Sequence, residues 1–271
     1  MDFVEAGKAV VMGVVEGITE FLPISSTGHL VITARVLDFK DPGEVFTVVI
    51  QLGAILAVCW YYRQRLWDLL RRLPSDATAR AFALTIVVAC LPAALIGIKA
   101  NKFLEAHLFI PAVVAATTAL GGLAIIIIER MKHQVHHTEA ERLPWRTALG
   151  IGLCQLLALV PGVSRSGATI MGALCLGVER KAATEFSFFL AIPVMVGASA
   201  LKLVKHHDQI NADRLGIIAV GFVVSFIVAL AVIHWLIRFV SSHTFTAFGW
   251  YRIVAGLLLA LAMVLGWIVS F

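Results

Sequence analysis

Residues 16–29 read EGITEFLPISSTGH, and residues 155–169 read QLLALVPGVSRSGAT. We call them the first and the second polar stretch, because they carry charged and hydroxyl groups in a chain that is 60% hydrophobic and only 14% charged. A single offset aligns them, since 164 − 25, 167 − 28 and 155 − 16 give the same difference. Polar, Gly/Pro-broken segments are costly in a membrane protein unless they line a functional cavity. Two matched copies therefore indicate one site at the interface of two repeats, near the bilayer midplane.

The rest of the chain predicts an all-α polytopic membrane protein with a single membrane domain over residues 1–271. A mean hydropathy of +0.91 over 271 residues excludes an ordinary soluble domain. The alternation of apolar and polar residues that is typical of a membrane β-barrel is absent. A cleavable signal peptide is not expected either, because Glu16 and Glu20 interrupt the first apolar run. Six apolar runs are long enough to be transmembrane helices: about 45–62, 82–99, 108–128, 185–204, 215–238 and 248–270.

Each polar stretch lies in a segment whose two apolar arms are too short to cross the bilayer comfortably. We therefore expect two re-entrant helical hairpins, at about 3–37 and 147–178, rather than four more spans. Three spans follow each hairpin, and three is an odd number, so the second half must be inverted relative to the first. The sequence thus predicts two inverted-topology repeats, at about 1–130 and 147–271.

The basic residues predict the orientation of the chain. Loops 63–81, 130–146 and 179–184 carry most of the lysines and arginines, and the loops on the opposite side carry few. We expect the basic loops to be cytoplasmic and both termini to be outside, so the two hairpins enter from opposite sides and their apices meet. The net charge of +5 then favours anionic lipid headgroups, and nothing resembles a nucleic-acid module. The four cysteines form no CxxC pair and read as buried small apolar side chains.

The first polar stretch combines a cation site with a nucleophile and a base. Glu16 and Glu20 are four residues apart, so they share a face near the negative end of the inbound helix. Two carboxylates there favour a hard divalent cation, Mg²⁺ or Ca²⁺. Ser25 or Ser26 can cap the returning helix, whose first amides then form an anion site. His29 lies on the same face as the serines and can act as a base. The expected anion-binding residues of this stretch are Ser25, Thr27 and Gly28.

The second polar stretch keeps the anion site and loses the acid–base groups. Gln155, Leu159 and Ala168 stand where the first stretch has Glu16, Glu20 and His29. Arg165 takes the place of Ser26, and a guanidinium beside hydroxyls at a helix start suits a phosphate or diphosphate. An arginine at membrane depth needs a partner, which would be the substrate phosphate, Glu16 or Glu20. The expected diphosphate-binding residues here are Ser164, Ser166, Gly167 and Thr169.

On these motifs the whole chain resembles the bacterial undecaprenyl-diphosphate phosphatase family, also called the bacitracin-resistance protein family. The first stretch matches the family's E/Q-x-x-x-E motif, residues 161–169 match P-G-x-S-R-S-x-x-T, and residues 185–193 are also similar. The resemblance implies a multi-pass enzyme of the bacterial inner membrane, with an active site open to the periplasm, that removes one phosphate from a C55 prenyl diphosphate. The product would be the carrier lipid reused in peptidoglycan synthesis, and its recycling would give bacitracin resistance. Expected partners are that lipid, the bilayer and, as an option, a second copy of the chain.

Under this hypothesis Ser26 attacks the terminal phosphorus while Glu20 or His29 takes its proton. Arg165 and a cation held near Glu16 and Glu20 neutralise the charge. Direct attack by water, with Ser26 only binding phosphate, is an open variant. The alternative function is a lipid-phosphate transporter or flippase, since inverted repeats with broken helices are usual in secondary carriers. A purely structural, channel-like subunit is a third interpretation, and it leaves Arg165 unexplained.

Overall fold

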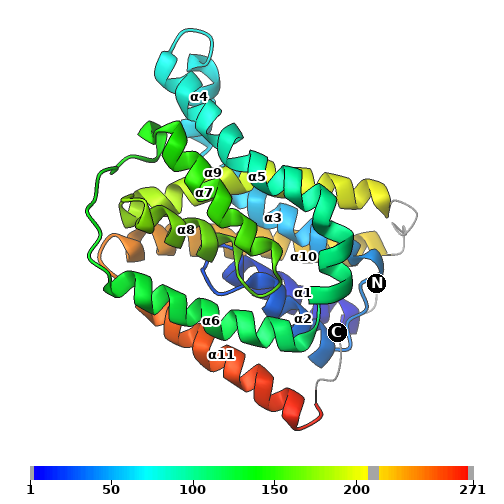
Figure 1. Ribbon diagram of the computed structural model, residues 1–271. Coiled ribbons are helices and arrows are strands. Elements are labelled where there is room, and N and C mark those ends of the chain that lie inside the picture. The colour runs from blue at the N-terminus through cyan, green and yellow to red at the C-terminus, as the bar shows by residue number, and fades with distance from the viewer. Residues whose placement is uncertain (1–2, 207–213, 268–271) are drawn as a thin grey trace.

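The chain folds as a bundle of helices in the computed structural model, which describes residues 3–206 and 214–267 (Figure 1). Within these residues there is no β-strand, only an isolated bridge between His137 and Val178. The helices of the first half are α1 (Phe3–Thr19), α2 (Ser26–Val36), η1 (Pro42–Glu44), α3 (Val45–Tyr61), α4 (Arg63–Arg72), α5 (Ala77–Leu108) and α6 (Pro111–Arg130). Those of the second half are η2 (Ala140–Arg142), α7 (Trp145–Gln155), η3 (Leu156–Leu159), α8 (Arg165–Cys175), α9 (Arg180–Lys205), α10 (Leu215–Val240) and α11 (Thr246–Val264).

Among the described residues, six helices are long and apolar enough to cross a membrane, which confirms an all-α, multi-pass protein. They are α3, α5, α6, α9, α10 and α11, each within a few residues of a predicted span. Helix α5 begins earlier than its apolar run because Asp76 caps it, accepting a hydrogen bond from the Thr78 amide. The length of the apolar run thus locates the span, whereas the capping residue determines where the helix begins. Residues 268–270 of the last predicted span lie outside the described residues.

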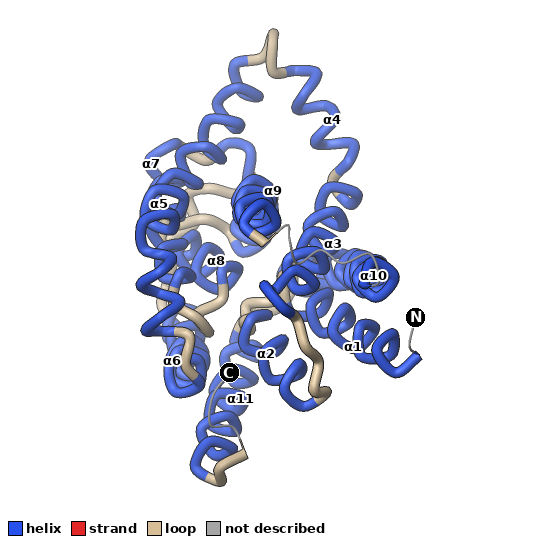
Figure 2. The backbone as a smooth tube through the Cα atoms, turned by 90° about the vertical axis from the view of Figure 1, so that its right-hand side faces the viewer, coloured by secondary structure: helices blue, strands red, loops and turns tan. Residues whose placement is uncertain are grey.

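The two predicted hairpin segments each form a pair of short helices. Helix α1 turns at residues 20–25 into α2, and α7 turns through η3 and residues 160–164 into α8. None of these four short helices is among the helices that meet the length and apolarity of a span. In Figure 2, which looks nearly along α9 and α10, α2 and α8 lie between α9 and the pair formed by α6 and α11.

Each short inbound helix packs on a long helix of the other half of the chain. Helix α1 lies along α10, and α7 lies along α5. Glycines allow both close approaches, because a Cβ on Gly13 would lie 2.7 Å from the Gly221 carbonyl oxygen, and a Cβ on Gly152 would lie 2.3 Å from that of Ala89. Gly13 and Gly152 are related by the same offset as the two polar stretches. The two halves are therefore interlocked.

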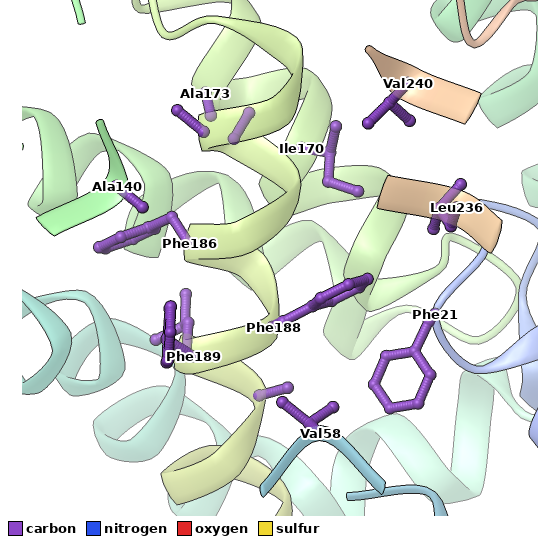
Figure 3. Close-up of a cluster of buried hydrophobic side chains, with 14 of the residues drawn as sticks. Phe21, Val58, Ala140, Ile170, Ala173, Phe186, Phe188, Phe189, Leu236 and Val240 are labelled. Carbon is purple, nitrogen blue, oxygen red and sulfur yellow. The ribbon is translucent and has the colours of Figure 1, made fainter. Parts of the chain in front are cut away.

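The apolar core anchors the first hairpin to α9. Phe21, at the turn after α1, packs edge-on against Phe188 of α9 with ring centroids 5.1 Å apart. One helical position further, Phe189 packs against Phe82 of α5, and both rings are buried. Figure 3 shows the α9 phenylalanines spreading from their helix toward Phe21 and toward neighbouring segments. Because Phe21 directly follows Glu20, this packing also fixes the position of Glu20.

Candidate active site

The end of α1 brings two carboxylates into the interior in very different surroundings. Glu16 is fully buried, and neither of its carboxylate oxygens has a hydrogen-bond partner. Glu20 is nearly as buried, but both of its oxygens are bonded: Oε2 accepts a hydrogen bond from the Ser26 hydroxyl, and Oε1 accepts one from Arg165 at 3.0 Å. One carboxylate is thus fully engaged and the other is unpaired.

Ser26 is the first residue of α2 and the only hydroxyl of its stretch that the structure pairs with a carboxylate. It follows Ser25, whose φ of 73° and ψ of 89° lie in the left-handed region that favours glycine. This sharp change of direction points the Ser26 hydroxyl back toward Glu20 at the end of α1. Thr27 and Gly28 follow in the first turn of α2, half-buried and buried respectively. No side chain caps α2, so the expected serine cap is not formed there.

Arg165 links the second polar stretch to the first. Its guanidinium donates to Glu20 and, through Nη1, to the Ser187 carbonyl at 3.1 Å, while its Nε has no partner. Only 13% of its side chain is exposed. The ion pair confirms one of the expected partners of Arg165. Ser187 was not predicted as a site residue, although it lies in the family-like segment 185–193.

The remaining hydroxyls of the second polar stretch brace the site. Ser164 caps α8, its hydroxyl accepting from the Gly167 amide at 3.1 Å. Ser166 donates across to the Leu22 carbonyl of the first stretch at 2.8 Å. Thr169 is fully buried and shares a 2.7 Å hydrogen bond with the Ser187 hydroxyl. These bonds hold the two polar stretches against each other.

A second buried arginine, Arg252 of α11, fixes the backbone of both turns. Its guanidinium donates to the carbonyls of Pro23 at 3.1 Å, Gly162 at 2.9 Å and Val163 at 2.8 Å. Two further bonds reach carbonyls of α6, where Gly121 leaves room for the guanidinium. Sequence reasoning missed Arg252. The available signal was its position as the single charged residue in the apolar run 248–270.

His29 lies apart from the Ser26–Glu20 contact. Its Nδ1 is 2.7 Å from the Ser25 carbonyl, and its Nε2 is 2.6 Å from the hydroxyl of Tyr251 on α11. Both ring nitrogens are therefore bonded to other groups. Of the two bases expected for Ser26, the structure places Glu20 in contact with the hydroxyl. Tyr251 is another residue that sequence reasoning missed, because an aromatic residue near a span end is usual at a membrane interface.

The Glu16 carboxylate suits a divalent cation that is also coordinated by water or phosphate oxygens. The described residues contain no cluster of three or more His, Cys, Asp or Glu side chains able to enclose a metal. A buried carboxylate without a partner is nevertheless very unfavourable unless it is protonated or meets a cation. Glu16 offers two free oxygens, and Mg²⁺ characteristically takes one or two carboxylates together with waters and substrate phosphates. The residues present fit such an ion.

The chain matches a known protein family and is similar to several known proteins over nearly its whole length. Residues 9–258 match the family model described as "Bacitracin resistance protein BacA". The chain is 56% identical to an undecaprenyl-diphosphatase of Parvibaculum lavamentivorans over 252 residues, covering 93% of this chain and 94% of the relative. It is 52% identical to undecaprenyl-diphosphatase 2 of Rhodospirillum rubrum, with 95% and 94% covered, and 47% identical to an undecaprenyl-diphosphatase of Laribacter hongkongensis, with 99% and 98% covered.

Proposed function

The chain belongs to the bacitracin resistance protein BacA family, and we propose that it is a membrane phosphatase that hydrolyses undecaprenyl diphosphate to undecaprenyl phosphate and inorganic phosphate. The contact that carries this proposal is the Ser26 hydroxyl bonded to Glu20, with Arg165 bonded to the same carboxylate. A hydroxyl, a base and a guanidinium at one buried point are the parts that phosphoryl transfer requires.

Ser26 acts as the nucleophile in the proposed reaction. Its oxygen forms a bond to the terminal phosphorus of the diphosphate, and its proton passes to Glu20. The bond from that phosphorus to the bridging oxygen breaks, and undecaprenyl phosphate leaves. A water oxygen then forms a bond to the phosphorus of the phosphoserine, and the bond from that phosphorus to the Ser26 oxygen breaks. The proton held by Glu20 returns to Ser26, and inorganic phosphate is released with the protons of the water. The proposal favours Glu20 over His29 as the base because only Glu20 contacts the hydroxyl.

Arg165 stabilises charge on the transferring phosphoryl group. Its bond to the Ser187 carbonyl fixes one side of the guanidinium, and its unpartnered Nε remains available to a phosphate oxygen. The amides at the starts of α2 and α8 add donors with a favourable helix dipole. Ser25, Thr27 and Gly28 on one side, and Ser164, Ser166, Gly167 and Thr169 on the other, form the proposed diphosphate cradle.

Glu16, with Glu20 beside it, is the proposed site of a divalent cation, Mg²⁺ or Ca²⁺. Such an ion supplies Lewis-acid neutralisation of diphosphate charge when it is bound. Glu16 contributes a buried carboxylate with no other partner. Glu20 lies one helical turn away, but its oxygens are already shared between Ser26 and Arg165. Glu16 is therefore the main protein ligand in this proposal.

We also propose that the two short helix pairs are re-entrant hairpins of two inverted repeats. The exchange of partners supports this, because α1 on α10 and α7 on α5 are equivalent contacts if α1 corresponds to α7 and α5 to α10. The left-handed residues support it too, since Ser25 and Ser164 have φ of 73° and 77° at equivalent positions. The family implies the bacterial inner membrane and a periplasmic opening. A transporter is not favoured, because the relatives bear a phosphatase name.

Phosphate release by the purified protein in detergent tests the function. No sidedness exists in detergent, so an enzyme releases phosphate from undecaprenyl diphosphate and a pure flippase does not. The variant Ser26→Ala should lose nearly all turnover, whereas Ser241→Ala, which removes a hydroxyl bonded to the last turn of α10, should retain it. Turnover near that of the wild type in Ser26→Ala would end the nucleophile role in favour of direct water attack.

Chelation tests the cation. Removing divalent ions should abolish phosphate release, and adding back Mg²⁺ or Ca²⁺ should restore it in the wild type. Glu16→Gln keeps the shape of the side chain but removes its charge, so the variant should need a much higher ion concentration. Full activity in chelator, or an unchanged ion requirement in Glu16→Gln, contradicts the proposed ligand.

A further inference from the structure

The backbone at Ser25 is strained, and its counterpart in the second half is held differently. Left-handed conformations are unfavourable for residues other than glycine, so the surroundings must hold them. Ser164 holds itself, because its hydroxyl accepts from the Gly167 amide and pairs with the Ser166 hydroxyl at 3.1 Å. Ser25 has the same positive φ but makes no such cap. Something else must keep it in place.

The ring of His29 bonds the Ser25 backbone, which has no cap of its own. Its Nδ1 is 2.7 Å from the Ser25 carbonyl oxygen, and a carbonyl can only accept, so Nδ1 carries the proton. The backbone amide of His29 is a weaker second donor to this carbonyl at 3.4 Å. Ala168 stands at the equivalent place in the second half, where the self-capped Ser164 needs no such help.

Tyr251 fixes the ring from its other side. With Nδ1 donating, Nε2 of the neutral imidazole is an acceptor, and the Tyr251 hydroxyl donates to it at 2.6 Å. The two rings also stack, with centroids 5.6 Å apart and planes 11° apart. The next residue, Arg252, holds the Pro23 carbonyl. One turn of α11 thus secures both sides of the turn that contains Ser25.

We propose that Tyr251 and His29 are positioning residues that hold Ser25 in its left-handed conformation and thereby direct the Ser26 hydroxyl at Glu20. His29 acts here as a hydrogen-bond donor to the backbone, and no proton leaves Ser26 through it. This inference rests on the proposed phosphatase function, since it concerns the geometry of its nucleophile. It accounts for a histidine that lies next to the nucleophile without touching it.

The variants His29→Ala and His29→Asn separate positioning from base catalysis. The amide nitrogen of asparagine occupies the place of Nδ1 and can still donate to Ser25, but asparagine cannot accept a proton in catalysis. His29→Ala should lower kcat about 100-fold with little change in KM, since a small misplacement of a reacting group has that effect. His29→Asn should recover at least about tenfold of this loss. Equal loss in both variants overturns the proposal.

Tyr251→Phe tests the second link, with Tyr61→Phe at the C-terminal end of α3 as its matched control. Loss of the phenol hydroxyl should lower kcat about threefold to tenfold, the effect of one neutral hydrogen bond, and Tyr61→Phe should match the wild type. In the His29→Ala background Tyr251→Phe should have no further effect, because the ring it holds is absent; an independent loss there overturns the coupling. If the wild type itself releases no phosphate, the proposed function fails, whereas a working wild type with unrescued His29→Asn refutes only this inference.

Discussion

Glu20 is the residue at which the two halves of the chain meet chemically. It follows α1 in the first half, bonds Ser26 of α2, and bonds Arg165 from the second half. A buried carboxylate that is bonded to both a guanidinium and a hydroxyl has its hydrogen-bonding capacity satisfied. Ser26 and Glu20 are therefore already in contact in the absence of substrate. Glu16 has the same charge without hydrogen-bond partners, and this difference separates the proposed base, Glu20, from the proposed ion ligand, Glu16.

Arg165→Lys should lower kcat by about 100-fold, the usual effect of removing one charge-stabilising donor. The guanidinium reaches Glu20 and the Ser187 carbonyl at once, which the single ammonium of lysine cannot do with the same geometry. Phosphate release by the purified variant is the measurement. The control is Arg146→Lys at the exposed start of α7, where Arg146 stacks on Trp145, and it should be unaffected. Similar rates in the two variants contradict the clamping role.

Arg252→Met should lower the thermal midpoint of the detergent-purified protein and abolish most phosphate release. Methionine fills similar space but leaves the buried carbonyls of Pro23, Gly162 and Val163 without their donor, at about 1–3 kcal/mol for each unsatisfied group. Arg238→Met, at the exposed end of α10, is the control and should melt as the wild type does. Identical midpoints for the two variants would show that Arg252 does not hold the turns.

Much of the site could be predicted because its chemistry is local in the sequence. The spacing of Glu20 and Ser26 and the motif around Arg165 were sufficient to predict that these three residues lie together, as their hydrogen bonds show. Arg252 and Tyr251 could not be predicted to join them, because each lies near one end of the chain and bonds a residue near the other end. Arg252, moreover, binds only main-chain carbonyls, and no side-chain pattern reveals a partner that is backbone.

At the scale of elements, small residues decide which helices touch. In a membrane the hydrophobic effect does not pair helices, so close contact depends on matching surfaces. Apolar length sufficed to predict the six spans, whereas the pairing of α1 with α10 and of α7 with α5 could not be predicted from the sequence of either helix alone. A glycine in a helix indicates that another helix can approach closely there, but it does not indicate which helix.

Gly152→Ala should destabilise the protein by about 1–3 kcal/mol and lower its thermal midpoint. The added Cβ would lie 2.3 Å from the Ala89 carbonyl oxygen, so α7 must move away from α5. The matched control is Gly197→Ala in α9, where a Cβ meets nothing within 4 Å, and it should be neutral or more stable because alanine favours helix. A Gly152→Ala variant that melts no lower than Gly197→Ala would refute the close packing.

At the scale of the whole molecule, ion pairs connect α9 to η1 and to α4, the two elements that flank α3. Glu44 pairs with Lys202 at one end, and Arg65 pairs with Glu185 at 2.7 Å at the other. Helices α3 and α9 also pack directly on each other. The segment after α3, containing α4 and the start of α5, extends away from the bundle (Figure 1), and it is rich in arginine.

Labelling of single cysteines tests the proposed orientation. In a background lacking Cys59, Cys90, Cys154 and Cys175, a membrane-impermeant maleimide added to intact spheroplasts should modify Lys40→Cys and spare Thr138→Cys. Residue 40 precedes the first span, and residue 138 lies in the basic connection between α6 and α7. Both sites should react after the cells are opened. The reverse pattern would place the basic loops outside.

The interlocked packing of the two halves has a consequence for biosynthesis. Gly13 of α1 packs against Gly221 of α10. The ribosome must therefore synthesise most of the chain after Gly13 before Gly221 is available. At translation rates of about 5–20 residues per second, α1 therefore waits roughly 10–40 seconds for its partner to leave the ribosome. During that time Gly13 and Gly17 of α1 have no native neighbour on α10. The packing of α1 in the bundle is therefore completed late, after α10 has been made, and it joins the two ends of the nascent chain.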